Sequence, residues 1–220
     1  MFKQTILITF RPEADEGARS ALLTRAQAAV SAELSIFAST LPDSYMGGDV
    51  VWHLHFASRE AWEASAAEAT LEILEKDPSV FRIDAAAYEP RRNGVRQPTL
   101  SNGVYRTLFV NVAAGTASPT IAQFEDELAS MPDYIPEIVN WAINPTVASR
   151  GDVAWTHVWE QEFADIGGLI GPYMTSAYHW SWIDRWFDPE MPCQIVGSGL
   201  LRHSASVLSA SVMASYRTQS

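Results

Sequence analysis

The chain has a single cysteine and few basic residues. Cys193 has no second cysteine with which to form a disulfide or build a thiolate metal site, and we interpret it as a packing residue. The 220 residues carry 15 Lys and Arg against 26 Asp and Glu, a formal net charge of -11. Binding to a phosphate backbone depends on clustered positive charge. The composition therefore argues against nucleic acid as a partner.

Long apolar runs are also absent. No run reaches the roughly 18 to 20 residues that cross a bilayer, and the first residues pass directly into a strand pattern without the apolar core of a signal peptide. No Gly-rich turn joins a strand to a helix, which argues against a dinucleotide or phosphoryl-transfer site. We therefore expect a cytoplasmic protein without a membrane partner. Its hydrophobic fraction of 47% is enough for a full core.

The chain contains two similar halves. The segment Gly-Asp-Val-Val-Trp at 48–52 recurs as Gly-Asp-Val-Ala-Trp at 151–155, and the strand-like residues 5–8 correspond to 107–110. Self-similarity at a fixed distance is typical of a repeat architecture. The sequence therefore predicts a tandem duplication.

A polar segment separates the two halves. Residues 91–103 are rich in Pro, Gly, Asn and Arg and show no apolar period, so we interpret them as a linker. The predicted domains are a structural first repeat at 1–90, a second repeat with the site at 104–204, and a tail at 205–220.

Each half shows the order strand, helix, strand, strand, helix, strand. In the first half the predicted strands are 3–10, 34–37, 49–57 and 79–88, with helices at 13–30 and around 62–73. In the second half the predicted strands are 104–112, 137–143, 152–163 and 193–202, with one helix beginning at Ser118-Pro119 and a broken helix from Asp165 to about Phe187. Two βαββαβ units predict an α+β fold of two ferredoxin-like repeats, each with helices on one face of its sheet. Because the bare faces have to be buried, we predict that they pack sheet to sheet as a single-chain pseudo-dimeric α+β barrel.

The second half concentrates aromatic and proton-transferring side chains. Alternation along the strand 152–163 places His157 on the face opposite to Glu160 and Glu162. We predict that His157 and Arg106 look across a dry pocket toward Tyr173 and His179 on the broken helix. The residues expected to contact the substrate are Trp155, Trp159, Trp182, Phe124, Leu128 and Leu108.

Each of these residues also has a structural interpretation. His157 and His179 could be hydrogen-bonded core histidines, and Tyr173 could simply pack its ring. Arg106 could neutralise a carboxylate such as Glu160 or Asp184. The first half has Leu54 at the position that the repeat assigns to His157, so we predict one competent pocket per chain, and we interpret His203 as a structural or surface residue.

The second half resembles the stress-responsive α/β-barrel (Dabb) family, a branch of the dimeric α+β barrels, over nearly its whole length. The first half resembles it only in element order and a few strand positions. In a plant polyketide cyclase of this family, a Tyr and a His six residues apart move protons without a cofactor, so the resemblance implies that role for Tyr173 and His179. It implies a pocket position for His157, and Arg106 stands where the cyclase has another histidine. The family often has His-Pro-x-His where this chain has Ser-Ala-Tyr-His at 176–179, so only the last histidine carries over.

The same side chains suit enolate chemistry. His179 could take a proton from an acidic C–H or O–H, Tyr173 could donate to the developing oxyanion, and Arg106 could hold a carboxylate or phenolate. We therefore predict a lyase or cyclase that needs no cofactor or metal and acts on an enolisable, aromatic or polyketide-like small molecule.

Two other classes of protein remain open. Other dimeric α+β barrels hold haem on a histidine, and His157 with Glu160 or Glu162 are conceivable ligands, although strand alternation separates them; a cofactor-free oxygenase is a variant of this reading. The third class is a non-catalytic small-molecule-binding stress protein. The tail has apolar residues at near-helical spacing and could dock on the barrel or on a second chain, which leaves a homodimer open.

Overall fold

The first repeat has its strands and helices in the predicted order. The computed structural model describes residues 1–42 and 44–216. The elements of this repeat are β1 (Phe2–Phe10), α1 (Glu16–Ala29), β2 (Leu34–Ser39), β3 (Val50–Phe56), α2 (Arg59–Glu63), α3 (Ala67–Lys76) and β4 (Val80–Tyr88). The Asp15 side chain accepts a hydrogen bond from the backbone N–H of Ala18 and so begins α1. The second predicted helix is two helices, and the Ser65 hydroxyl between them accepts from the N–H of Ala67.

The second repeat repeats this order with a broken final helical segment. Its elements are β6 (Gly103–Val112), α4 (Ser118–Tyr134), β7 (Ile138–Arg150), β8 (His157–Phe163), α5 (Ile166–Gly168), two π-helical turns at Leu169–Tyr173 and His179–Ile183, a 3₁₀ turn at Asp184–Trp186, and β9 (Val196–Leu208). Pro172 lies inside the first π-helical turn, where it removes a backbone N–H from the helical ladder. The predicted break in this helix is confirmed. Strand β9 continues six residues beyond the predicted end at residue 202, because it stays paired with β6 up to Leu208.

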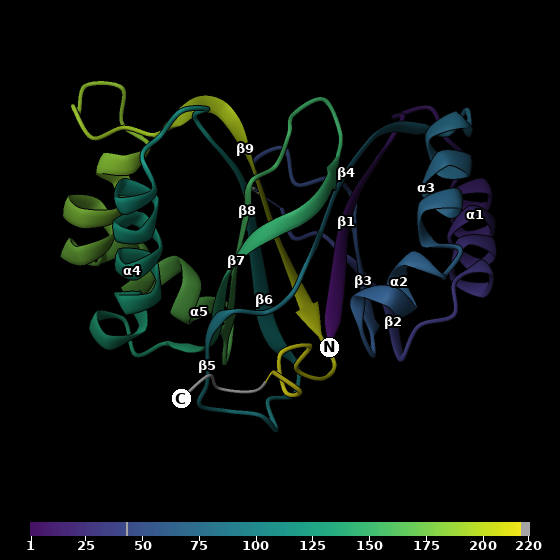
Figure 1. The fold of residues 1–220 in the computed structure, drawn as a ribbon. Helices are drawn as coiled ribbons and strands as arrows, with labels where there is room; N and C mark the ends of the chain where they lie inside the picture. The colour runs from purple at the N-terminus through teal and green to yellow at the C-terminus, as the bar shows by residue number, and fades with distance from the viewer. Residues whose placement is uncertain (43, 217–220) are drawn as a thin grey trace.

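The two sheets face each other and the helices lie outside (Figure 1). The strand order is β2-β3-β1-β4 in the first repeat and β7-β8-β6-β9 in the second, so the repeats share one topology. Strand β4 pairs antiparallel with β7 and joins the two halves. On the other side, isolated bridges Thr40–Ser206 and Met46–His203 connect the end of the first repeat's β2 region to β9. The predicted pseudo-dimeric α+β barrel is confirmed.

A polar network fills part of the space between the sheets. Lys3 of β1 forms a buried ion pair with Glu160 of β8. The Glu160 carboxylate also accepts from the hydroxyls of Tyr105 at 2.7 Å and Tyr216 at 2.8 Å, and from Asn144 Nδ2 at 3.0 Å. A buried charge is tolerated only where its hydrogen-bonding capacity is satisfied. The network therefore ties both repeats and the C-terminal segment into one arrangement.

Two segments between and after the repeats are more ordered than the sequence indicates. Within the predicted linker, Arg92–Val95 forms a short strand, β5, which pairs with β7. Within the tail, residues 205–208 belong to β9, and the following residues pack on the barrel without forming a helix, with Val212, Met213 and Tyr216 buried. Residues 217–220 of the tail lie outside the described residues. No helix in the described part of the chain is long and apolar enough to cross a membrane.

The structural equivalence of the repeats differs from the one that the shared motif indicates. Phe2 pairs with Phe56 and Val104 pairs with Phe163, so Trp52 of β3 is equivalent to Trp159 of β8 and not to Trp155. Strand β8 begins only at His157, and Trp155 lies in the segment before it. The position of Leu54 therefore corresponds to Gln161, and the predicted equivalence of Leu54 with His157 is wrong.

Candidate active site

Arg106 lies on the outer face of β6, under the helical segment of the second repeat. Its side chain is almost fully buried, with the residue 7% exposed. The guanidinium Nε donates to His203 Nε2 at 2.8 Å and Nη1 donates to Gln161 Oε1 at 2.5 Å. Among the described residues Nη2 has no hydrogen-bond partner, and no carboxylate lies within ion-pair distance of the guanidinium. A buried charge held only by neutral groups is costly, so this arginine is suited to binding an anion.

Tyr173 and His179 lie next to each other above this arginine. They come from the two consecutive π-helical turns, and their ring centroids are 4.4 Å apart. The Arg106 Cζ lies 5.0 Å from the centroid of the Tyr173 ring. Both rings are buried. The structure therefore brings together three of the four side chains that the sequence offers for proton transfer and charge binding.

The protonation states of the two rings suit a base and an acid. Burial, and then the positive charge of Arg106, lower the pKa of His179 to about 4, so its imidazole is neutral at pH 7. His179 Nε2 lies 3.5 Å from Asp184 Oδ1, and Nδ1 is buried with no hydrogen-bond partner in the described part of the chain. A proton on Nε2 facing Asp184 leaves Nδ1 as the basic nitrogen. Burial raises the pKa of Tyr173, so the phenol keeps its proton.

Two residues of this site were not among the predicted site residues. His203 accepts the Arg106 hydrogen bond, and burial with the Arg106 charge lowers its pKa to about 3. Its alternation with Leu201 and Ala205 on a strand was the available signal, but the predicted strand ended before it. Asp184 comes five residues after His179, a spacing that a π-helical turn places on one side. An ordinary α-helix pattern does not indicate that pair.

The site opens into two adjoining hollows that share Arg106, Tyr173, His179 and His203. The smaller, of about 210 Å³, has walls of Leu108, Leu128, Trp159, Ile183, Phe187 and Leu201, with Asp184 and Tyr45 at its edge. The larger, of about 590 Å³, is bounded by Leu41, Pro42, Ser44, Ile166, Leu169, Ile170, Met174 and Ala205. We call them the small chamber and the large chamber. Leu41, Pro42, Ser44 and Tyr45 follow β2, so the first repeat supplies one wall of the site and is more than the structural partner that the sequence indicates.

One further polar atom in the small chamber lacks a partner. Trp159 is buried on β8, and its Nε1 donates no hydrogen bond to any described residue. A buried N–H without an acceptor costs free energy on the order of 1–3 kcal/mol. Together with the free Arg106 Nη2, this donor favours a ligand that carries acceptor oxygens.

The second repeat is similar to a known domain family. It matches the stress responsive A/B barrel domain. The match covers residues 104–195, which is 92 of the 220 residues, and leaves the first repeat outside. The resemblance to the Dabb family predicted from the sequence is thus confirmed for this repeat. No curated protein matches the chain.

Solved structures match the whole barrel at low sequence identity. An anthrone oxidase-like protein superposes with a TM-score of 0.62 and 11% identity, covering 94% of this chain and 90% of that chain. A candidate monooxygenase from Lactobacillus acidophilus NCFM gives a TM-score of 0.52 and 13% identity, covering 94% and 95%. A candidate chlorite dismutase gives 0.51 and 10%, covering 98% of both chains. At these identities the likeness shows the fold, which both repeats build together.

His157 of the Dabb repeat lies apart from the other three predicted residues. It precedes Gln161 by four positions on β8, about 13 Å at a rise of about 3.3 Å per residue. Its Nε2 is 3.3 Å from Glu125 Oε1 of α4, and its Nδ1 is 2.9 Å from the Thr156 hydroxyl. Both ring nitrogens therefore have partners, and His157 holds β8 to α4. The predicted meeting of His157 with Tyr173 and His179 is wrong, because strand alternation places residues on one face without placing them at the same end.

The predicted substrate-contacting residues divide in the same way. Leu108, Leu128 and Trp159 line the small chamber. Phe124 packs instead between His157 and Trp186. Trp155 faces the inter-sheet core, where Arg202 lies over its ring, because it precedes β8 and does not follow the alternation of that strand. Trp182 is half exposed and stacks with Arg185 outside the chambers.

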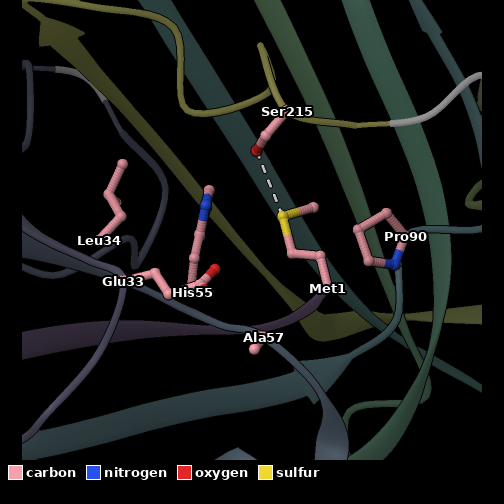
Figure 2. A pocket seen from close by; sticks show the side chains of 7 residues that line it. All are labelled: Met1, Glu33, Leu34, His55, Ala57, Pro90 and Ser215. Atoms are coloured by element: carbon pink, nitrogen blue, oxygen red, sulfur yellow. Dashed lines mark hydrogen bonds between the residues drawn. The ribbon is translucent and has the colours of Figure 1, made fainter.

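A larger hollow lies at the end of the first repeat (Figure 2). Its volume is about 760 Å³, and it is lined by Met1, Glu33, Leu34, His55, Ala57, Pro90 and Ser215. Burial, and then the charge of Lys3, lower the pKa of His55 to about 3. None of the described residues that line it is an arginine or a tyrosine. Because its described lining residues offer neither a tyrosine beside the histidine nor an arginine, the small and large chambers are the better candidate for the site.

The residues present do not fit the haem ligation considered for this fold. His157 is engaged on both nitrogens, and Glu160 and Glu162 lie on the other face of β8 in the inter-sheet network. Nor do the described residues contain a group of three or more His, Cys, Asp or Glu side chains arranged to hold a metal ion. His157, Glu160 and Glu162 therefore do not form a site for haem iron.

Proposed function

We propose that the protein is a cofactor-independent enzyme of the lyase or cyclase type, which removes a proton from a carbon next to a carbonyl group of an aromatic or polyketide-like small molecule. The observation that carries this proposal is the neutral His179, whose Nδ1 is free, beside a protonated Tyr173 and an uncompensated Arg106 in one hollow. A base, an acid and a fixed positive charge are the groups that form and stabilise an enolate.

His179 is the base of the proposed reaction. Its low pKa keeps the imidazole unprotonated at neutral pH but makes it a weak proton acceptor. An anionic substrate beside Arg106 offsets the charge that lowers this pKa, so substrate binding strengthens the base. Asp184 then lies next to the imidazolium that forms and stabilises it.

Tyr173 and Arg106 stabilise the enolate oxygen. The Tyr173 hydroxyl donates a hydrogen bond or a proton, since burial keeps the phenol neutral. Arg106 supplies a charge that no carboxylate within ion-pair distance neutralises among the described residues. Removal of one such donor from an enzyme typically costs about 10²–10³ in kcat.

The enolate has two fates, which correspond to two classes of enzyme. Attack on a second carbonyl, or loss of a leaving group, gives a cyclase or a lyase. Reaction with dioxygen gives an oxygenase, and the likeness of the fold to an anthrone oxidase-like protein and to a candidate monooxygenase favours this as the second candidate. Both fates share the proton removal by His179.

The test is solvent deuterium exchange. The protein is incubated in D₂O with β-keto aryl compounds and with anthrone, and loss of the acidic C–H signal is followed by NMR, with product mass and oxygen uptake measured in parallel. We expect catalysed exchange, falling about 10²–10⁴-fold in His179→Gln and less in Tyr173→Phe. New carbon–carbon bonding or cleavage indicates the lyase or cyclase, and oxygen uptake indicates the oxygenase.

Two matched variants control for general damage to the fold. His157→Gln changes a buried histidine outside the chambers, and Tyr178→Phe changes a tyrosine whose hydroxyl donates to the Glu127 carbonyl oxygen. Both should exchange deuterium at the wild-type rate. Equal loss in His157→Gln and His179→Gln, or binding without exchange across the panel, would leave a small-molecule-binding protein as the better description.

A further inference from the structure

We infer that the ligand of the Dabb site is an amphipathic monoanion, in which one anionic oxygen group sits at Arg106 and an apolar body occupies the large chamber. The inference rests on the proposed function only in sharing its site, since binding can be measured without turnover. It follows from how charge, donors and apolar walls are divided between the two chambers.

The anionic group belongs where the chambers meet. Arg106 lines both chambers, and its first neighbours His203 and Gln161 are neutral, so its charge is available to a ligand. The unpartnered Trp159 Nε1 provides a second donor on the small-chamber side. A guanidinium with a free nitrogen and a neighbouring N–H match the acceptor geometry of a carboxylate, an enolate or a phenolate.

Asp184 limits the ligand to one negative charge. It lines the small chamber but not the large one, and it contacts His179. Burial raises its pKa, yet the positive charge of Arg106 opposes that rise. A second anionic group extending into the small chamber would meet this carboxyl group. The small chamber, with its walls of Leu, Ile and Phe, therefore takes the uncharged end of the ligand.

The large chamber is built for an apolar body. Among its lining residues in the described part of the chain, Arg106 is the only one that carries a full charge at neutral pH. Its volume of about 590 Å³ lies within the roughly 300–1,000 Å³ range of drug-sized ligands, whereas the small chamber lies below it. At its edge Ile166, Ile170 and Met174 are exposed. A ligand body seated there removes these side chains from water, which stabilises the complex.

The experiment compares three probes of equal chain length. Decanoate, decanol and decylammonium are titrated into the wild-type chain below their micellar concentrations, with binding followed by calorimetry. We expect decanoate to bind at least tenfold more tightly than decanol, decylammonium to bind more weakly still, and acetate to show no saturation. Equal affinity for decanoate and decanol, or tight binding of acetate, would overturn the inference without any variant.

Variants locate the two parts of the ligand. Arg106→Gln should reduce the ratio of the affinities for decanoate and decanol to about one. Arg106→Lys keeps the positive charge and should retain part of this preference, and it serves as the second variant if Arg106→Gln folds poorly. Ile170→Gln should weaken decanoate severalfold. Ile73→Gln on α3 is its control, because both isoleucines are 65% exposed. Equal effects of the two isoleucine changes would contradict a body seated in the large chamber.

The outcomes separate this inference from the proposed function. Selective decanoate binding without deuterium exchange in any enolisable compound would sustain the amphipathic anion and reject the enolate chemistry. Deuterium exchange in neutral compounds without selective decanoate binding would sustain the enolate chemistry and reject the amphipathic anion.

Discussion

The outer faces of the two sheets occupy equivalent places in the two repeats, yet their buried polar side chains differ in whether they have hydrogen-bond partners. In the first repeat Trp52 donates from Nε1 to the Ser35 hydroxyl, and Gln4 bonds to both Glu68 and Trp62. In the Dabb repeat the equivalent residues are Trp159, whose Nε1 has no partner among the described residues, and Arg106, which has no carboxylate. One face satisfies its polar groups internally, and the other leaves them for a ligand.

This difference indicates which repeat carries chemistry. Native cores rarely leave buried donors unpaired, and the exceptions call for an explanation. In the first repeat the sheet is covered by the packed helices α2 and α3, with Trp62 and Leu71 buried against it. In the Dabb repeat the broken segment between Ile166 and Trp186 leaves chambers under it. Because the broken helical segment packs less regularly on the sheet, it leaves space in which a ligand can bind.

Lowering the pH should have the largest effect on the free energy of unfolding. It tests whether buried neutral histidines destabilise both repeats at low pH. Burial lowers the pKa of His53 and His55 in the first repeat and of His179 and His203 in the second. At these four histidines the unfolded chain therefore binds more protons than the native one below pH 6.5. The contribution of these histidines to the free energy of unfolding should be complete above pH 6.5. As the pH drops toward 4, it should fall by up to about 1.4 kcal/mol per pH unit for each histidine.

Urea unfolding at pH 7, 6 and 5 measures this dependence. His55→Phe and His203→Gln should each make it shallower by a similar amount, since one buried neutral imidazole is removed from each repeat. An unfolding free energy that does not change between pH 7 and 5 would show that these histidines are not buried as described.

Arg106→Gln places the first repeat's residue, Gln4, at the equivalent position of the Dabb repeat. Because the variant removes the only full positive charge among the described chamber residues, we expect kcat/KM for the substrate found by deuterium exchange to fall about 10²–10³-fold. Arg150→Gln, which changes an arginine paired with Glu68 and Glu75 outside the chambers, is the control and should keep its activity. A loss below threefold in Arg106→Gln would argue against its role.

Trp52→Phe and Trp159→Phe compare the two faces directly. Both variants lose similar apolar contact, but only Trp52→Phe breaks a hydrogen bond and leaves Ser35 unpaired. Its free energy of unfolding should therefore fall by about 1 kcal/mol more than that of Trp159→Phe. Thermal and urea unfolding give the stabilities, and calorimetry with decanoate gives binding, which only Trp159→Phe should weaken. The reverse order of stabilities would remove the contrast between the repeats.

The smallest effect on activity should come from His157→Asn. This change loses contacts to Glu125 and Thr156, so we expect about 1 kcal/mol of stability to be lost while kcat/KM stays within twofold of the wild type. Steady-state kinetics and urea unfolding on the same preparation make the comparison. A tenfold loss of kcat/KM with unchanged stability would return His157 to the site.

Much of the fold could be predicted because local periodicity encodes it. Alternation along β6 and β8 indicated that Arg106 and Trp159 share an outer face, and the structure agrees. The motif shared by 48–52 and 151–155 predicted the wrong alignment of β3 with β8. The segment before β8 is longer, so the true equivalence is shifted by four residues. The possible homodimer stays a prediction.

The site could be predicted only in part. Tyr173 and His179 are close in sequence, and one helical segment brings them together. His203 reaches Arg106 only because β9 pairs with β6 in one register, and Pro42 reaches the large chamber only because the barrel closes between β2 and β9. The spacing of residues along the sequence indicates neither of these contacts.

The sequence alone determined the order of the elements, the shared face of Arg106, Leu108 and Trp159 on β6 and β8, and the chemical groups available, because these depend on neighbours a few positions apart. The tertiary structure decided which groups meet, which donors stay unpaired, and where space remains. Those outcomes depend on strand register and barrel closure, which are set by packing between residues about a hundred positions apart.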